Sequence, residues 1–448
     1  MLALVLLLVP QDGQVEAGRE PHSALRIEVS GALDLHYLER GGEINAAGGA
    51  LNGVAPPVTR STNAWSGRVS LRADARLRDS VTGVVEVENR SFDEGLNRPF
   101  SSDPETDTLD LKQAYIDVAE FLDPKLGLRI GIQDLAIRNR PHDEPFFLDL
   151  GRSEGFFEGF APSGHIRDTA DRDVQEATGI TASWALHEVL LVRAAALVYS
   201  ENGPASSDES VYLLTANAAI PDSLALWVLG VLVSGGDPDL GGVWTLGAGV
   251  NGYLFEDRPL EVFAEGYLQR GELTDAVSKR AWAGNAGLRW LAGFADNKAW
   301  IEAAVSFRSG NRSVTDGRDE AFQSYENENR FLIVQSAEFG LDLDTNLRAV
   351  RAAAGAGPFE IVEGKPLRLQ VDVAQFTADQ RLRDAAGAVL ARGEDDWGLE
   401  VDAGLSWSFN ASLLFTLKGA WLLGSELFNE LTGDDHSALG LFGASLRF

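Results

Sequence analysis

Arginine side chains recur at alternate positions in several segments of this chain, with apolar residues between them. Between residues 65 and 77, Arg68, Arg72 and Arg76 share one side of the pattern, whereas Val69 and Leu71 share the other. Successive side chains of a β-strand point to opposite faces, so the pattern predicts strands with one charged and one apolar face. So many charges cannot enter a dry core unpaired. The charged faces must therefore contact water or hold ion pairs.

Two kinds of chemistry fit such a surface. The planar fork of a guanidinium binds carboxylates well, so a wall bearing arginines would guide an anionic polymer or solute. Alternatively, the arginines and carboxylates pair with one another and stabilise the wall. We select these candidate lining residues: Arg68, Arg72, Arg76, Arg90, Asp117, Arg129, Arg193, Glu265, Arg289, Arg308, Arg348, Arg368, Glu400 and Asp402.

The chain gives no comparable signal for catalysis or for a cofactor. None of its six histidines lies in a Gly-x-Ser-x-Gly or His-Glu-x-x-His motif, so we do not expect an enzyme. The acidic run of Asp103, Glu105, Asp107 and Asp110 could hold Ca²⁺ through carboxylate oxygens. It lacks the spacing of an EF-hand, so solvated loop charges are the simpler interpretation. We expect no resident metal and no cofactor.

The elements that position these residues are predicted strands. No run of about 20 apolar residues follows the N-terminus, as a spanning helix would require, so only a closed barrel could cross a bilayer. Long and short connections alternate, as they do between the extracellular loops and periplasmic turns of outer-membrane barrels. We therefore predict an all-β fold, a transmembrane antiparallel β-barrel of about 18 strands. The predicted strands are residues 25–37, 65–77, 81–90, 109–118, 126–135, 177–184, 189–199, 211–220, 224–234, 243–255, 260–269, 281–291, 299–308, 346–355, 367–376, 399–407, 413–421 and 440–448.

One apolar segment does not fit this count. Residues 330–334 (RFLIV) could form a further strand, which would make the total odd. We assign them to a long outer loop over residues 309–345, because the alternation of long and short connections then continues to the C-terminus.

Residues 136–176 are too long for a simple connection. This segment contains Phe146, Phe147, Phe156 and Phe157, which would be poorly placed in water, and also Arg152. We expect it to fold inward and constrict the lumen. The alternative is an outer cap that packs on neighbouring loops.

Both ends of the chain carry recognisable signals. Residues 1–17 combine an apolar run with a small-residue cleavage site, which predicts a signal peptide; the alternative is a buried first strand. Residues 18–24 would then form a short lead, and residues 25–448 a single barrel domain. The chain ends on Phe448, after an amphipathic last strand. Such a terminal aromatic is typical of proteins that the barrel-assembly machinery inserts into the outer membrane of Gram-negative-type bacteria.

The surroundings of the chain follow from its surface chemistry. Tryptophans near the predicted strand ends, such as Trp184, Trp244, Trp282, Trp290 and Trp300, suit aromatic girdles at the two interfaces. We therefore expect the lipid bilayer and lipopolysaccharide as partners. A net charge of -29 argues against nucleic-acid binding.

Several short motifs, in their shared order, resemble the alginate-export family of outer-membrane barrels. They are residues 111–117 (LKQAYID), 128–135 (LRIGIQDL), 151–153 (GRS), 346–351 (NLRAVR) and 398–402 (GLEVD). Ile132 lies where that family usually has a basic residue. The resemblance implies a monomeric 18-stranded barrel that exports an anionic, alginate-like polysaccharide through an arginine-lined pore, with periplasmic export partners. The alternative is a general or substrate-specific porin for small solutes.

Overall fold

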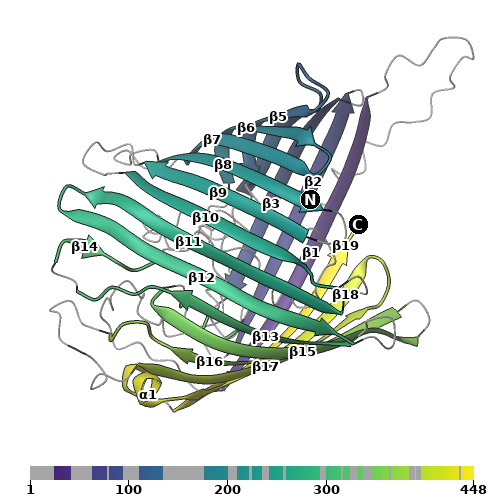
Figure 1. Ribbon diagram of the computed structural model, residues 1–448. Helices are drawn as coiled ribbons and strands as arrows, with labels where there is room; N and C mark the ends of the chain where they lie inside the picture. Colours follow the sequence, from purple (N-terminus) through teal and green to yellow (C-terminus); the bar gives the residue numbers. More distant parts are fainter. Residues whose placement is uncertain are drawn as a thin grey trace, which may run out of the picture.

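Strands account for nearly all of the regular structure in the computed structural model (Figure 1). The structure describes residues 25–41, 63–77, 80–93, 110–134, 176–199, 209–220, 224–234, 242–255, 259–292, 299–313, 316–322, 331–335, 343, 345–362, 365–382, 389, 395–432 and 435–448. Three predicted features lie outside these residues: the signal peptide and lead (residues 1–24), the constriction segment, and the first three members of the acidic run, Asp103, Glu105 and Asp107.

One antiparallel sheet closes on itself, because β1 pairs with both β2 and β19. Of the nineteen strands in the described residues, β14 has only two residues, and the other eighteen form the wall. This confirms the predicted barrel. The strands are β1 (Arg26–Gly41), β2 (Asn63–Leu77), β3 (Val81–Asp93), β4 (Asp110–Val118), β5 (Leu126–Asp134), β6 (Glu176–His187), β7 (Leu190–Tyr199), β8 (Glu209–Ile220), β9 (Leu224–Ser234), β10 (Gly242–Tyr253), β11 (Leu260–Thr274), β12 (Val277–Leu291), β13 (Ala299–Arg308), β14 (Arg318–Asp319), β15 (Leu347–Val362), β16 (Lys365–Thr377), β17 (Asp396–Ser408), β18 (Leu413–Gly424) and β19 (His436–Arg447).

The outer face of the wall is apolar and exposed, as a face in contact with lipid must be. Leu214, Val228 and Val305 are each more than half exposed at 58%, 55% and 52%, and each occupies the middle of its strand. Their neighbours in sequence, such as Leu213 and Trp227, point inward and are buried. The period of two therefore sorts the residues as the sequence predicted.

The seam between the first and last strands is closed by the terminal residue. The N–H of Gly31 donates to the carbonyl of Phe448 at 2.8 Å, and the N–H of Phe448 donates to the carbonyl of Gly31 at 3.0 Å. The ring of Phe448 lies so close to Gly31 that a Cβ added there would be 2.6 Å from a ring carbon. Gly31 thus leaves the space that the C-terminal aromatic fills.

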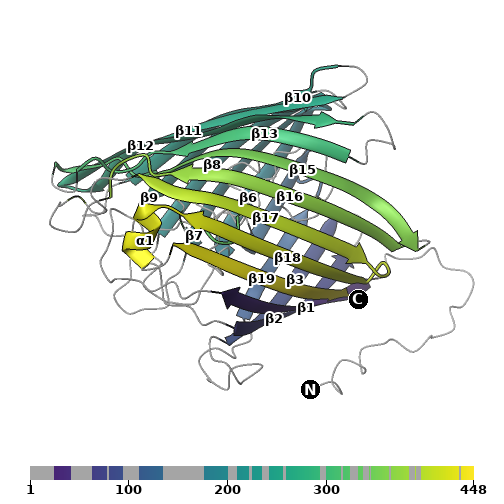
Figure 2. The ribbon, with the colours of Figure 1, turned by 90° about the horizontal axis from the view of Figure 1, so that it is seen from below.

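The two ends of the barrel differ. Turns of two to seven residues separate the strands at one end, where the C-terminus also lies, whereas helix α1 (Glu426–Thr432) lies at the other (Figures 1 and 2). Except for the two-residue turn between β11 and β12, the strands that meet at the α1 end are joined by longer stretches of sequence. Short turns face the periplasm in such barrels. We therefore call the end that bears α1 the extracellular end.

Part of the inner face is apolar as well, which the alternating pattern did not predict. Inward residues of β7, β8, β9, β11 and β12, including Leu213, Trp227 and Tyr267, form a buried cluster that also contains Phe322 from the connection after β13. Glycines make room for the rings, since a Cβ at Gly249 would be 2.4 Å from the Trp227 ring and one at Gly247 would be 2.6 Å from the Tyr267 ring. The barrel therefore contains a packed core along one side.

Candidate channel lining

A row of inward arginines extends over β2, β5 and β7. Arg72 on β2 lies between two carboxylates, with its Nε 3.0 Å from Asp74 Oδ2 and its Nη1 3.5 Å from Glu86 Oε2. The Nη2 of the same guanidinium donates to the Tyr115 hydroxyl at 3.4 Å. The Arg72 side chain remains 35% exposed. Water therefore reaches this part of the inner face.

Arg129 on β5 continues the row. Its Nη2 donates to Asp117 Oδ2 at 2.8 Å, and its guanidinium carbon lies 4.1 Å from the centre of the Tyr115 ring. Tyr115 thus contacts both arginines, one through its hydroxyl and the other through its ring face. A ring face attracts a cation through its quadrupole. These contacts fix the direction of the Arg129 side chain, which is 34% exposed.

Arg193 on β7 has different neighbours. Its Nε donates to the Ser183 hydroxyl at 3.3 Å, and among the described residues no carboxylate lies within ion-pair distance of it. Thr215 is directly opposite Arg193 on β8, and its hydroxyl is buried. Arg193 is therefore an inward cation between two residues with neutral hydroxyls, Ser183 and Thr215.

The wall from β11 to β15 contains the other arrangement expected of these charges. The Nη2 of Arg289 lies 2.7 Å from Glu302 Oε2, and the Nε of Arg351 lies 3.6 Å from Glu302 Oε1. All three side chains are at most 4% exposed. The guanidinium carbon of Arg289 also lies over the Trp300 ring, 4.2 Å from the ring centre. Here the charges pair with one another and stabilise the wall. Arg289, which was predicted to line the lumen, is therefore not exposed to water there.

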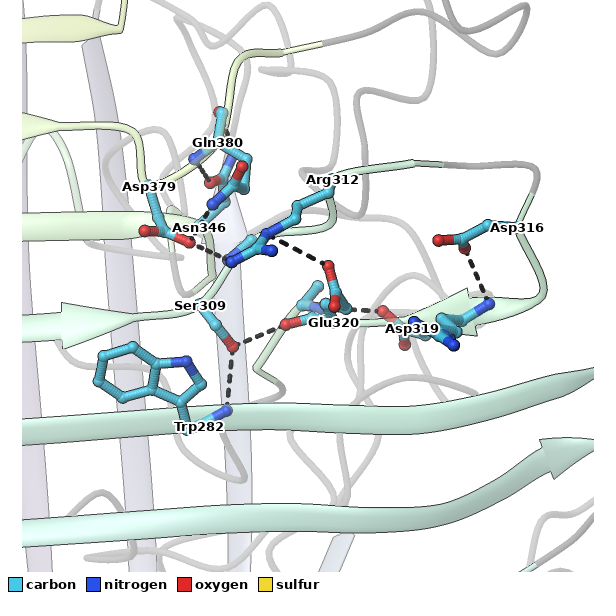
Figure 3. Close-up of polar contacts among 12 residues, drawn as sticks. Trp282, Ser309, Arg312, Asp316, Asp319, Glu320, Asn346, Asp379 and Gln380 are labelled. Atoms are coloured by element: carbon cyan, nitrogen blue, oxygen red, sulfur yellow. Dashed lines mark hydrogen bonds and ion pairs between the residues drawn. The ribbon is translucent and has the colours of Figure 1, made fainter.

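The described residues of the connection between β13 and β15 fold onto the inner face. Ser309 fixes its start, since the Trp282 N–H donates to the Ser309 hydroxyl at 3.0 Å, and this hydroxyl donates to the Glu320 carbonyl at 2.6 Å (Figure 3). Asn346 fixes its end, because the Asn346 side chain accepts from the Gln380 N–H at 2.6 Å. Between these anchors, β14 pairs with β12, and Lys279 binds Asp319 at 2.8 Å.

The middle of this connection is held by two carboxylates of β17. Residues 331–335 form a turn, in which the Gln335 N–H donates to the Phe331 carbonyl at 3.2 Å. The N–H groups of Ile333 and Val334 donate to the two oxygens of Glu400 at 2.7 and 2.9 Å. The Leu332 N–H donates to Asp402 Oδ2 at 3.0 Å. Buried carboxylates need such hydrogen bonds, so wall and turn stabilise each other.

The described residues 331–335 form no strand, as predicted, but they pack against the inner face and are not part of an outer loop. This arrangement also changes the role expected of Glu400 and Asp402. Both point inward as predicted, but both are buried, at 0% and 3% exposure, by the turn that they bind. They are therefore not exposed lining residues.

Arg348 was predicted to line the lumen, and the structure contradicts this. It pairs with Phe307 across the sheet and shares the outer face of β15 with Val350, which is 65% exposed. Its guanidinium binds Asp379 at the extracellular rim. The inward arginine of this strand is Arg351, which the sequence analysis missed. The spacing of three between the two arginines required one of them to face outward, but each arginine has apolar residues on both sides, which gave no sign of which one it is.

The remaining predicted residues are distributed as follows. Arg76, Glu265 and Arg368 face inward and are partly exposed, and Arg308 faces inward and is buried. Arg68 and Arg90 lie directly opposite each other on β2 and β3. The inward aromatic constriction expected from Phe146, Phe147, Arg152, Phe156 and Phe157 stays a prediction. Within the described residues, no group of three acidic, histidine or cysteine side chains could hold a metal ion.

The fold and the apolar outer face define a closed β-barrel of eighteen antiparallel strands, of the kind found in the outer membrane. Among the described residues, no helix is long and apolar enough to cross a membrane. No protein-family model matches the chain, and no curated protein matches its sequence.

Solved structures match it over nearly its whole length. OccK5 (OpdH) of Pseudomonas aeruginosa is similar with a TM-score of 0.55 and 12% identity, covering 94% of this chain and 98% of its own. OccAB4 of Acinetobacter baumannii has a TM-score of 0.53 and 12% identity, covering 96% of this chain and 100% of its own. The outer membrane protein OprD of Pseudomonas aeruginosa has a TM-score of 0.53, 12% identity and 94% coverage of both chains. At this identity the likeness establishes the fold alone.

Proposed function

We propose that this chain is an outer-membrane channel for small anionic solutes. The observation that carries the proposal is the row of Arg72, Arg129 and Arg193, three inward cations on nearby strands. The first two are partly neutralised by carboxylates, whereas Arg193 is not paired with one among the described residues. A carboxylate-bearing solute would therefore find its best complement near Arg193.

The inward connection after β13 favours small solutes over a polymer. Phe322 and residues 331–335 are packed against different parts of the inner face, so the described residues of this connection occupy part of the interior. The solved structures that match the chain include the outer membrane protein OprD of Pseudomonas aeruginosa. Passage of an alginate-like polysaccharide, which the sequence motifs suggested, has no comparable support.

Ion selectivity tests the proposal. Purified protein in planar bilayers under a KCl gradient should give a reversal potential that indicates anion preference, because local charge at the lining governs selectivity. The double variant Arg129→Gln/Arg193→Gln should move this potential toward cation preference. Arg348→Gln is the matched control. It removes an arginine from the outer face, so it should leave the reversal potential unchanged. A cation-selective wild-type channel would rule out the proposal.

A further inference from the structure

Two arginines on the outer face of the barrel are directly opposite each other near the extracellular end. Arg270 on β11 pairs with Arg280 on β12, and both side chains are exposed. Like charges directly opposite in an antiparallel pair are destabilising. Arg270 Nη1 donates only to the Gln269 carbonyl at 3.3 Å, and among the described residues no carboxylate lies within ion-pair distance of either arginine. In the described part of the chain, neither arginine therefore has a carboxylate in an ion pair to offset their repulsion.

Their surroundings place them at the membrane interface. On β10, Trp244 is directly opposite Arg270. One step of two residues toward the barrel centre, Leu268 is directly opposite Trp282, and these two side chains are 49% and 52% exposed. Such a step covers about 7 Å along a strand, so the arginines lie just outside the apolar band, beside the aromatic residues that mark interfaces.

The nearby charges leave the patch positive. Arg318 on β14 is exposed and directly opposite Ser278, so it shares the outer face of β12 with Arg280. The acidic neighbours are Glu272, which is exposed and opposite Ser278, Asp275, which is exposed in the turn between β11 and β12, and Asp316, which accepts the N–H of Arg318. Asp275 and Asp316 lie at the hairpin tip beyond the pair, so Glu272 is the acidic residue next to the two arginines.

We propose that Arg270 and Arg280 bind the phosphate groups of a phosphorylated glycolipid in the outer leaflet. Guanidinium groups bind phosphate through paired, charge-assisted hydrogen bonds. A doubly charged phosphate between the two arginines would replace their repulsion by attraction. The flanking Trp244, Trp282 and Leu268 present ring and aliphatic surface to the acyl chains of the same lipid. Arg318 extends the patch toward a second phosphate.

Lipid titration of the folded barrel in detergent, followed by native mass spectrometry, tests the proposal. The probes are a bisphosphorylated lipid A, its dephosphorylated form and phosphatidylglycerol, with inorganic phosphate as competitor. The wild type should prefer the bisphosphorylated lipid. Arg270→Gln/Arg280→Gln should bind it about tenfold more weakly, since two exposed charge pairs are lost. Lys365→Gln is the matched control, because Lys365 contacts Phe409 at the periplasmic end and should not affect binding.

Two results would overturn the proposal: equal binding by the double variant and the wild type, or equal binding of the phosphorylated and dephosphorylated lipids. Displacement of the lipid by millimolar inorganic phosphate would show a simple anion site and would overturn the lipid assignment. The single variants Arg270→Gln and Arg280→Gln provide a second readout. Without lipid, each should be at least as heat-stable as the wild type, because the repulsion is removed. With bisphosphorylated lipid A, the wild type should become the more stable protein, and the absence of this reversal would also overturn the proposal.

Discussion

The inward arginines differ in what neutralises them. Arg72 is close to both Asp74 and Glu86, whereas Arg193 donates to the hydroxyl of Ser183. A charge that is already paired contributes less to the potential felt by a passing ion than an unpaired one. We therefore expect Arg193→Gln to reduce anion preference more than Arg72→Gln does. Reversal potentials of the two single variants under the same KCl gradient measure the difference, and equal shifts would contradict this ranking.

The buried ion pairs make a second prediction at the level of single residues. Glu302 lies between Arg289 and Arg351, and replacing it with glutamine leaves two buried guanidinium groups without this carboxylate. Breaking a buried pair in this way typically costs about 3–5 kcal/mol. Glu302→Gln should therefore lower the free energy of unfolding in urea by roughly that amount.

Glu28 provides the control for this measurement. It also lies between two arginines, at 2.6 Å from Arg26 and 3.7 Å from Arg76, but its side chain is 40% exposed. Exposed ion pairs are worth about 0–1 kcal/mol, so Glu28→Gln should have little effect. Similar losses in the two variants would show that burial does not govern the strength of these interactions.

Among the elements, the connection after β13 is the one most open to experiment. In Glu400→Gln, one of the two carboxylate oxygens becomes an NH₂ group that faces the N–H of Ile333 or Val334. Two donors then oppose each other, so the turn at residues 331–335 should detach from β17 part of the time. We expect a larger or fluctuating single-channel conductance. Val401→Ala, on the outer face of the same strand, is the control, and unchanged conductance in Glu400→Gln would show that the turn does not limit flow.

The strands could be predicted from the sequence because lipid contact imposes strict alternation. The strand ends were predicted less well, because residues beyond the apolar band do not contact lipid and need not alternate. β11 and β12 extend to Thr274 and Val277, well beyond the predicted ends at residues 269 and 281, because the polar residues of this hairpin tip lie outside the apolar band. The capture of residues 331–335 by Glu400 was not predictable either, since 65 or more residues separate the partners. Periodicity assigns a residue to a face, but it does not say what covers that face.

For the whole molecule, the two faces of the wall must respond oppositely to the same substitution. Val228 lies in the middle of β9, on the outer face, and is 55% exposed. An arginine at a lipid-facing midplane position costs about 2–4 kcal/mol in a barrel, so Val228→Arg should impair insertion into liposomes. Gln113 points inward on β4, directly opposite Glu86. An arginine at position 113 would have both water and a carboxylate within reach, so Gln113→Arg should insert as the wild type does.

Heat-modifiable migration on a gel separates the folded from the unfolded barrel and measures both variants in one assay. The expected result is a reduced folded fraction for Val228→Arg alone. If Gln113→Arg fails equally, the inner face of β4 is dry and packed, and the arginine row next to it could not line a channel. If both variants fold fully, the outer face of β9 does not contact lipid. The assay thus tests the assignment of the two faces of the wall, on which both the bilayer location and the proposed channel depend.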